Sequence, residues 1–200
     1  MGIEGLYQAL PEGCELLARA IRDPAFAEPF SVANWIPGNP QWLKWGGAWA
    51  ECARELSKLC ETHSGLERRR FDVGPRWDVL HYLLSEARRE GHFDRDDWGT
   101  HALRGAAALA SHLAGGQGIP LRYSRPEIVQ VIAEHLGPMT EEDLRRTWEP
   151  ARMEAQAVYK FWADRAGEDE WGWTVEAFRG LQAFYRQVAS HREGVLVTRD

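Results

Sequence analysis

The chain has 200 residues, a formal net charge of −6 and 44% hydrophobic residues, which fits one globular domain of roughly 100–200 residues. The negative charge argues against a nucleic-acid partner, and no signal peptide and no apolar stretch near the roughly 20 residues that span a membrane is evident. Because its 3 cysteines are an odd number in a chain of this length, we expect reduced thiols and a cytoplasmic location.

Strand and helix patterns alternate through the first part of the chain. Residues 3–10 are predicted to form a strand, and Pro11 suits the first turn of a helix that ends at Asp23-Pro24. The stretch 24–40 is rich in Pro, Gly and Asn and is expected to be a loop or a set of short helical turns that pack by aromatic side chains. One continuous helix is predicted over residues 41–63, because apolar side chains recur there every three or four positions.

A second helix pattern follows a short extended segment around residues 71–73. Residues 77–89 carry apolar side chains at helical spacing and are predicted to form one helix. The Ala-rich stretch 101–113 is also predicted to be helical. Residues 119–123 have the composition of a further strand.

Helices dominate the last part of the predicted structure. They are expected to follow the caps Ser124 and Thr140, to start at Pro150, and to follow the cap Thr174. The third of these is expected to run through Trp162. Residues 167–173 are expected to form an acidic loop, and residues 194–198 a closing strand.

The predicted strands lie far apart along the sequence. They must therefore pair non-locally, and about six or seven helices are available to cover them. These features predict a helix-rich α/β fold built around a small mixed sheet.

Several short motifs also occur in a characteristic order. They are the opening Met1-Gly2-Ile3, the segments 76–84, 123–136, 139–144, 153–159 and 178–185, and the closing Val195-Leu196-Val197. In this order they resemble the YfbM-like family of bacterial domains of unknown function, domain family 1877. The resemblance implies a three-layer α/β fold with helices on both faces of the sheet, and it implies no catalytic or binding residues.

The chain departs from that family in two places. Residues 24–66 look longer and richer in Trp, so we interpret residues 1–200 as a single YfbM-like domain with a Trp-rich helical insertion around 24–66. Residues 85–89 extend the predicted helix where family members have a Thr-Gly turn.

Asp78 and His81 are the strongest candidates for catalysis. Their spacing places them on one face of the predicted helix, and with Tyr82 or Tyr123 nearby they could act in general acid–base chemistry. The alternative, which we favour, is a structural pair in the core, because no nucleophile or cofactor-binding motif accompanies them. We expect no cofactor.

Cys52, Cys60 and His63 have the residue types of a zinc site. In a helix the two cysteines would lie about 12 Å apart, and a tetrahedral zinc with bonds of about 2.3 Å cannot reach both. We therefore expect no metal site.

Tryptophan is unusually frequent, with 10 residues. A Trp stripe at helical spacing favours core packing, and an aromatic groove for a partner or ligand is the alternative. Trp171 and Trp173 cannot share one helical stripe, so at least one is expected to be exposed. The candidate binding residues are Trp35, Trp42, Trp45, Tyr123, Glu127, Trp171 and Trp173.

Three functions remain open. We favour a non-enzymatic binding or accessory module that engages a protein partner or a small ligand, because the chain is rich in Trp, acidic and without a catalytic motif. One alternative is a small-molecule enzyme that uses the Asp78–His81 pair. The other is a structural or oligomerising domain in which the Trp-rich helix forms a homodimer face.

Overall fold

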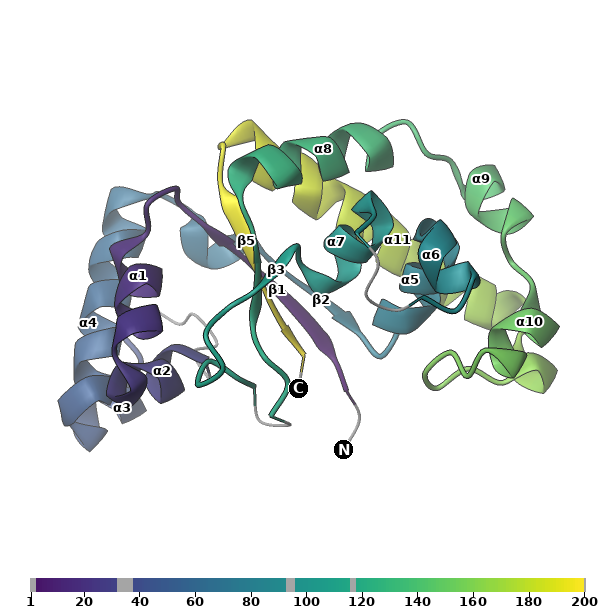
Figure 1. The fold of residues 1–200 in the computed structure, drawn as a ribbon. Coiled ribbons are helices and arrows are strands. Elements are labelled where there is room, and N and C mark those ends of the chain that lie inside the picture. Colours follow the sequence, from purple (N-terminus) through teal and green to yellow (C-terminus); the bar gives the residue numbers. More distant parts are fainter. Residues whose placement is uncertain (1–2, 32–37, 93–95, 116–117, 200) are drawn as a thin grey trace.

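A five-stranded open sheet organises the molecule. The computed structural model describes residues 3–31, 38–92, 96–115 and 118–199, and in these residues the strand order is β2-β1-β5-β4-β3. The strands are β1 Gly5–Leu10, β2 Arg70–Gly74, β3 Ala107–Ala108, β4 Arg122–Ser124 and β5 Gly194–Arg199. β1 and β5 come from opposite ends of the chain and lie side by side (Figure 1).

Each pairing described in this sheet is antiparallel, where the sequence predicts a mixed sheet. Strand direction depends on how the intervening helices return the chain to the sheet, and the apolar pattern does not encode that path. The strands predicted at residues 3–10 and 194–198 are confirmed as β1 and β5.

Helices make up most of the described chain. Those before β2 are α1 Glu15–Arg22, α2 Pro24–Ser31, α3 Pro40–Trp45, α4 Gly47–Thr62 and the 3₁₀ helix η1 Leu66–Arg68. Those after β2 are α5 Trp77–Leu84, α6 Glu86–Arg89, α7 Trp98–Arg104, α8 Pro126–Leu136, α9 Glu141–Arg146, α10 Pro150–Ala155, the 3₁₀ helix η2 Ala163–Arg165 and α11 Glu168–Ser190. In the part of the chain described, no helix is both long and apolar enough to cross a membrane.

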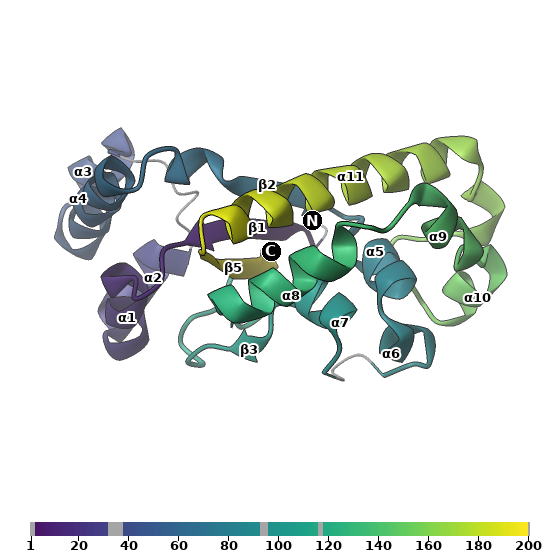
Figure 2. The same cartoon turned by 90° about the horizontal axis from the view of Figure 1, so that it is seen from above.

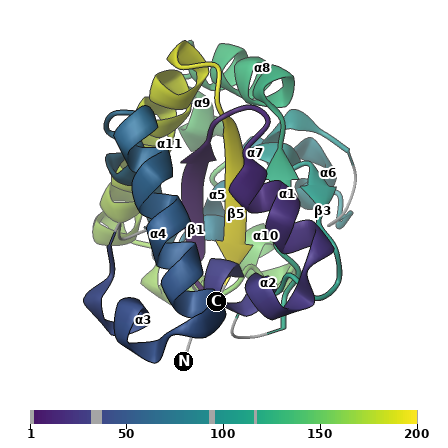
Figure 3. The same ribbon diagram turned by 90° about the vertical axis from the view of Figure 1, so that its left-hand side faces the viewer.

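The side chains of β1 and β5 alternate between two hydrophobic cores. Tyr7, Ala9 and Val197 enter the core formed with α5, α7, α8 and α11, whereas Leu10 and Leu196 enter the core formed with α1, α2 and α4. α8 and α11 pack together over one face (Figure 2), and α1 and α4 stand in front of the other (Figure 3). The predicted helix-rich α/β fold with helices on both faces is confirmed.

Residues 24–31 form the short helix α2, in agreement with one of the two predictions for this stretch. Asp23 Oδ1 accepts a hydrogen bond from the Ala25 N–H at the start of this helix, and the helix packs by its buried side chains Phe26 and Phe30. Proline is compatible with a first helical turn, so a Pro-rich composition does not exclude a short helix. Residues 32–37 of this stretch lie outside the described residues.

The helix predicted for residues 41–63 is two helices. Gly46 between them has φ 72° and ψ −166°, a conformation essentially confined to glycine. Trp42 and Trp45 therefore belong to α3, and Trp49 belongs to α4. A periodic apolar pattern does not reveal such a break, because it continues across it.

The helix predicted for residues 101–113 ends early. Gly105 has φ 75° and follows the last residue of α7, and Ala107–Ala108 then form β3. The helix predicted from Pro150 through Trp162 also ends early, at Ala155.

The acidic residues at 168–170 form the first turn of α11 rather than a loop. Carboxylates are stabilised at a helix N-terminus, which explains why an acidic run is helical here. Thr174 consequently lies inside the helix, and its Oγ1 donates to the Glu170 carbonyl oxygen at 2.8 Å.

The other two predicted Ser/Thr caps differ in outcome. Thr140 caps α9 in a reciprocal capping box with Asp143, as predicted. Ser124 lies in β4 instead, where its Oγ accepts a hydrogen bond from the Ala106 N–H at 3.0 Å.

Candidate functional site

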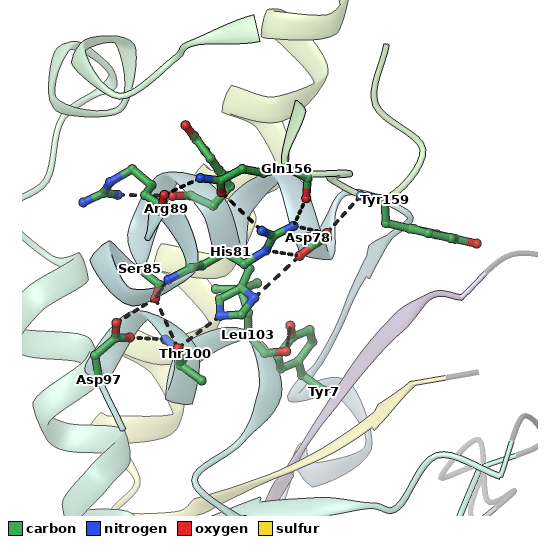
Figure 4. Close-up of polar contacts among 12 residues, drawn as sticks. Tyr7, Asp78, His81, Ser85, Arg89, Asp97, Thr100, Leu103, Gln156 and Tyr159 are labelled. Atoms are coloured by element: carbon green, nitrogen blue, oxygen red, sulfur yellow. Dashed lines mark hydrogen bonds and ion pairs between the residues drawn. The ribbon is translucent and has the colours of Figure 1, made fainter. Parts of the chain in front are cut away.

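The predicted Asp78–His81 pair lies on α5 in a polar network between helices (Figure 4). His81 Nδ1 is 3.6 Å from Asp78 Oδ1, and the two side chains are 0% and 2% exposed. His81 Nε2 is 3.1 Å from Thr100 Oγ1. A substrate cannot reach side chains buried to this extent, so the geometry favours the structural interpretation over the catalytic one.

Arg88 is the partner of Asp78 that sequence reasoning missed. Its Nε and Nη2 donate to Asp78 Oδ1 and Oδ2 at 3.1 and 3.0 Å, and its side chain is as buried as that of Asp78. Burial raises the pKa of the Asp78 carboxyl, but His81, Arg88 and the Tyr159 N–H more than offset this and lower it to about 2. Asp78 is therefore a permanent carboxylate within a bidentate ion pair.

A break at Ser85 brings Arg88 back to Asp78. In the continuous helix predicted over residues 77–89, these two residues would be about 15 Å apart along the axis. Ser85 has φ −108° and ψ 119°, its Oγ accepts from the Arg88 N–H at 3.0 Å, and it donates to Asp97 Oδ2 at 2.6 Å. The sequence Ser85-Glu86 carries the signal of a helix N-cap, which the apolar periodicity hides.

The Asp78–Arg88 pair also holds the segment between α10 and η2, which we call the 156–162 loop. Asp78 Oδ2 accepts from the Tyr159 N–H at 2.9 Å, and Arg88 Nη2 donates to the Gln156 carbonyl oxygen at 3.3 Å. Ala157 and Lys160 in this loop have φ of 50° and 51°, values that residues other than glycine rarely adopt. The buried pair thus stabilises an unusual backbone conformation.

The 156–162 loop forms one wall of a cleft of about 350 Å³ that we call the two-Trp cleft. It is lined by Arg76, Lys160, Trp162, Arg165, Asp169, Glu170 and Trp173. The indoles of Trp162 and Trp173 are 49% and 56% exposed. Arg165 Cζ is 5.2 Å from the centre of the Trp162 ring, and Arg76 Cζ is 5.4 Å from that of Trp173.

Charges in the two-Trp cleft are only partly compensated. Arg76 is ion-paired with Glu170. Lys160 and Arg165 form no ion pair with any residue that the structure describes. Of the five charged side chains, three are cationic, so the cleft has a positive formal charge in a chain whose net charge is −6.

A second cleft, of about 560 Å³, lies beside α6, α7 and α9. Two of its five carboxylates have structural roles. Asp97 accepts from the Thr100 N–H and from the Ser85 hydroxyl, and Asp143 caps α9. Arg89 is the one Lys or Arg among its lining residues, so its formal charge is negative, opposite to that of the two-Trp cleft.

The predicted binding residues do not converge on one site. Trp173 lines the two-Trp cleft, whereas Trp171 packs edge-on against Trp148 with ring centres 5.1 Å apart. Two helical positions separate the side chains of Trp171 and Trp173 by about 200°. Trp173 is exposed, which agrees with the prediction that at least one of the two is.

The Trp residues of α3 and α4 divide between core and surface. Trp42 is 5% exposed and Trp45 is 60% exposed, and both contact Trp49 edge-on, at 5.4 and 4.9 Å between ring centres. Core packing therefore holds for Trp42 and fails for Trp45. Trp35 lies outside the described residues.

The remaining candidates have separate positions. Tyr82 is buried, and its hydroxyl donates to Glu149 Oε2 at 3.3 Å. Burial raises the pKa of Tyr123 to about 12, and Glu127 is exposed in the first turn of α8. These positions support no shared chemistry with Asp78.

The cysteines are free thiols, as predicted. Burial raises the pKa of Cys52 to about 12 and that of Cys60 to about 11, so both are protonated and unreactive near neutral pH. Within the described residues, no three His, Cys, Asp or Glu side chains are grouped as metal ligands.

Comparisons with known proteins agree with this architecture. The sequence model described as "Domain of unknown function (DUF1877)" matches residues 38–198, and no curated protein matches the chain. The crystal structure of YfbM from Escherichia coli, described as a protein of unknown function, has 14% identity and a TM-score of 0.59, over 98% of this chain and 99% of that one. The chain therefore belongs to the DUF1877 family and has a YfbM-like fold.

Proposed function

We propose that this protein is a non-enzymatic binding module and that the two-Trp cleft is its binding site. The observation that carries the proposal is the pair of half-exposed indoles, Trp162 and Trp173, lining one concave site. Trp supplies a large, rigid contact area at low entropic cost and is enriched at binding hot spots.

The composition of the cleft supports binding rather than catalysis. None of its seven lining residues is a Cys, Ser, Thr or His, side chains that often serve as nucleophile or base, and one of its two carboxylates, Glu170, is already ion-paired with Arg76. The Asp78–His81 pair is buried in the network behind the 156–162 loop. Its place there supports a scaffolding role.

A ligand-observed NMR screen with a library of small aromatic and aliphatic fragments tests the proposal. Wild-type protein is compared with the Trp162→Ala and Trp173→Ala variants, and Trp45→Ala is the matched control, because Trp45 is 60% exposed on α3. We expect the fragments that bind wild type to be lost in both cleft variants and retained in the control. Fragment binding that survives both cleft substitutions would contradict the proposal.

A homodimer face on α3 is the second candidate function. Trp45 and Leu43 are 60% and 45% exposed there, and exposed apolar side chains of this size favour association. Sedimentation equilibrium distinguishes the two candidates, since a dimer that Trp45→Ala converts to a monomer supports the homodimer face.

The three free cysteines support a cytoplasmic location, where thiols remain reduced.

A further inference from the structure

We infer that the ligand of the two-Trp cleft is a small molecule that joins a planar ring to an anionic group, a phosphate or a carboxylate. This inference rests on the proposed binding function. It specifies the chemistry of the ligand from the charges, the rings and the size of the cleft.

Unused positive charge is the argument for an anion. Glu170 is paired with Arg76, which leaves Lys160 and Arg165 against the single carboxylate of Asp169. Neither Lys160 nor Arg165 has an ion-pair partner among the described residues. An anion bound between them would supply that partner, and the cleft attracts it although the whole chain has a net charge of −6.

The indole–guanidinium contacts are the argument for a planar ring. Arg165 lies over the Trp162 ring and Arg76 over the Trp173 ring. A guanidinium that lies over an indole has its N–H donors in its own plane, directed away from the ring; those of Arg165 are available to a carboxylate or phosphate, whereas Arg76 is already paired with Glu170. The indole beside it offers a flat apolar surface on which an aromatic ring stacks.

The size of the cleft is the argument for a small molecule. Its volume of about 350 Å³ lies at the lower end of the roughly 300–1,000 Å³ of small-molecule pockets. A stable protein partner would cover about 800 Å² on each side. One ring with one anionic substituent suits a site of this volume.

The cleft is organised before a ligand arrives. The 156–162 loop is held through Tyr159 and Gln156 by the buried Asp78–Arg88 pair, and this loop carries Lys160 and Trp162. Backbone that is already ordered in the free protein loses less entropy on binding. The backbone that carries Lys160 and Trp162 is anchored to the buried pair in this way.

The test uses isothermal titration calorimetry on the whole chain with five probes: phenyl phosphate, benzoate, phenol, benzylamine and inorganic phosphate. We expect both anionic rings to bind at least about 10-fold more tightly than phenol, a difference of about 1.4 kcal/mol, and benzylamine to bind most weakly. The Lys160→Ala/Arg165→Ala double variant should bind phenyl phosphate only as tightly as it binds phenol. The Trp162→Ala variant should bind every ring-containing probe more weakly than wild type does.

Four comparisons keep the outcomes distinct. The control variant Lys44→Ala removes a charge from the exposed surface of α3 and should leave all affinities unchanged. Melting temperatures equal to that of wild type show that the variants fold. If phenol or benzylamine binds as tightly as phenyl phosphate, the ligand class is wrong and the binding function stands. If Trp162→Ala changes the affinity of none of the ring-containing probes, both the ligand class and the proposed binding function are wrong. Inorganic phosphate as tight as phenyl phosphate would overturn the requirement for a ring.

Discussion

A single buried ion pair, Asp78–Arg88, links the helical core to the candidate site. Both side chains are at most 2% exposed, so each charge depends on the other for solvation. Asp78 also accepts the Tyr159 N–H. The residue with the strongest appearance of catalytic chemistry in the sequence is thus placed to support the wall of a binding cleft.

Removing one partner of this pair should destabilise the fold strongly. Asp78→Ala leaves the Arg88 guanidinium buried without its carboxylate, and we expect a loss of about 3–5 kcal/mol in the free energy of unfolding, measured by urea denaturation. The exposed Lys58–Glu55 pair is the control, where Glu55→Ala should cost less than about 1 kcal/mol. Equal losses of unfolding free energy in the two variants would contradict a larger contribution from the buried pair.

His81 should make stability depend on pH. Burial lowers the pKa of His81 below its ordinary 6.5, so the unfolded chain takes up a proton near pH 6.5 while the folded protein does not. Stability is then lost as the pH falls from about 7 to 5, by at most about 1.4 kcal/mol per pH unit. Asp78, whose pKa is lowered to about 2, adds a loss only below about pH 4.

The variant His81→Gln isolates this effect. The difference in unfolding free energy between wild type and His81→Gln should shrink as the pH is lowered over that range, because the variant lacks the titrating group. A difference independent of pH from 7 to 5 would mean that folded His81 has an ordinary pKa.

At the level of single residues, the sequence predicts proximity but not burial. The spacing of Asp78 and His81 correctly indicates that they are neighbours, since it depends only on local helix geometry. Their enclosure depends on α7, which contributes Thr100, and on Arg88, which the break at Ser85 redirects. Neither contact follows from spacing along a continuous helix.

Among the elements, the 156–162 loop is the one on which the candidate site depends. If the Asp78 carboxylate anchors it, Asp78→Asn should accelerate hydrogen exchange of the Tyr159 amide by about 10–100-fold, since a hydrogen bond to a charged group contributes about 1.5–3 kcal/mol. Amides of β5 serve as the internal control and should change less. A uniform acceleration across Tyr159 and β5 would indicate general destabilisation without a local anchor.

The break between α3 and α4 tests the role of glycine conformation. Gly46→Ala should cost about 1–3 kcal/mol in unfolding free energy, because φ 72° and ψ −166° exclude a side chain, although nothing lies within 4 Å of the added methyl group. Gly172→Ala is the matched control. It also has nothing within 4 Å but lies inside α11, so the same change should stabilise by about 0.4–1 kcal/mol. Equal effects at the two positions would contradict this explanation.

At the level of elements, periodicity predicts where helices lie better than where they end. The patterns at 41–63 and 77–89 are helical, yet each is divided by one residue, Gly46 or Ser85, whose backbone conformation breaks the helix while the apolar spacing continues. The sequence does not predict the acidic first turn of α11, because charged residues suit a loop as well as a helix N-terminus.

At the scale of the whole molecule, the layers were predictable and the strand directions were not. The closing strand at 194–198 is apolar and pairs with the strand at 3–10. Pairing between such distant segments is expected when the chain has few strands and each one needs a partner. The two-residue β3 has too little pattern to detect. The interpretation of residues 24–66 as an insertion relative to the family stays a prediction, and these helices cover one face of the sheet together with α1.

The two-Trp cleft itself could not be found from the sequence. Its residues come from the start of α5, the 156–162 loop, η2 and the first turns of α11, which the fold brings together over nearly a hundred positions. Of its lining residues, the sequence indicates only Trp173, together with Trp171, because two Trp at this spacing cannot share one helical stripe.

The most direct test of the account is the indole region of the ¹H–¹⁵N spectrum during titration with phenyl phosphate. The chain has 10 Trp, and the account predicts saturable shifts for the indoles of Trp162 and Trp173 with no change at buried Trp42 on α3. Shifts confined to Trp45 and Trp49, or no shifts at any Trp, would contradict it.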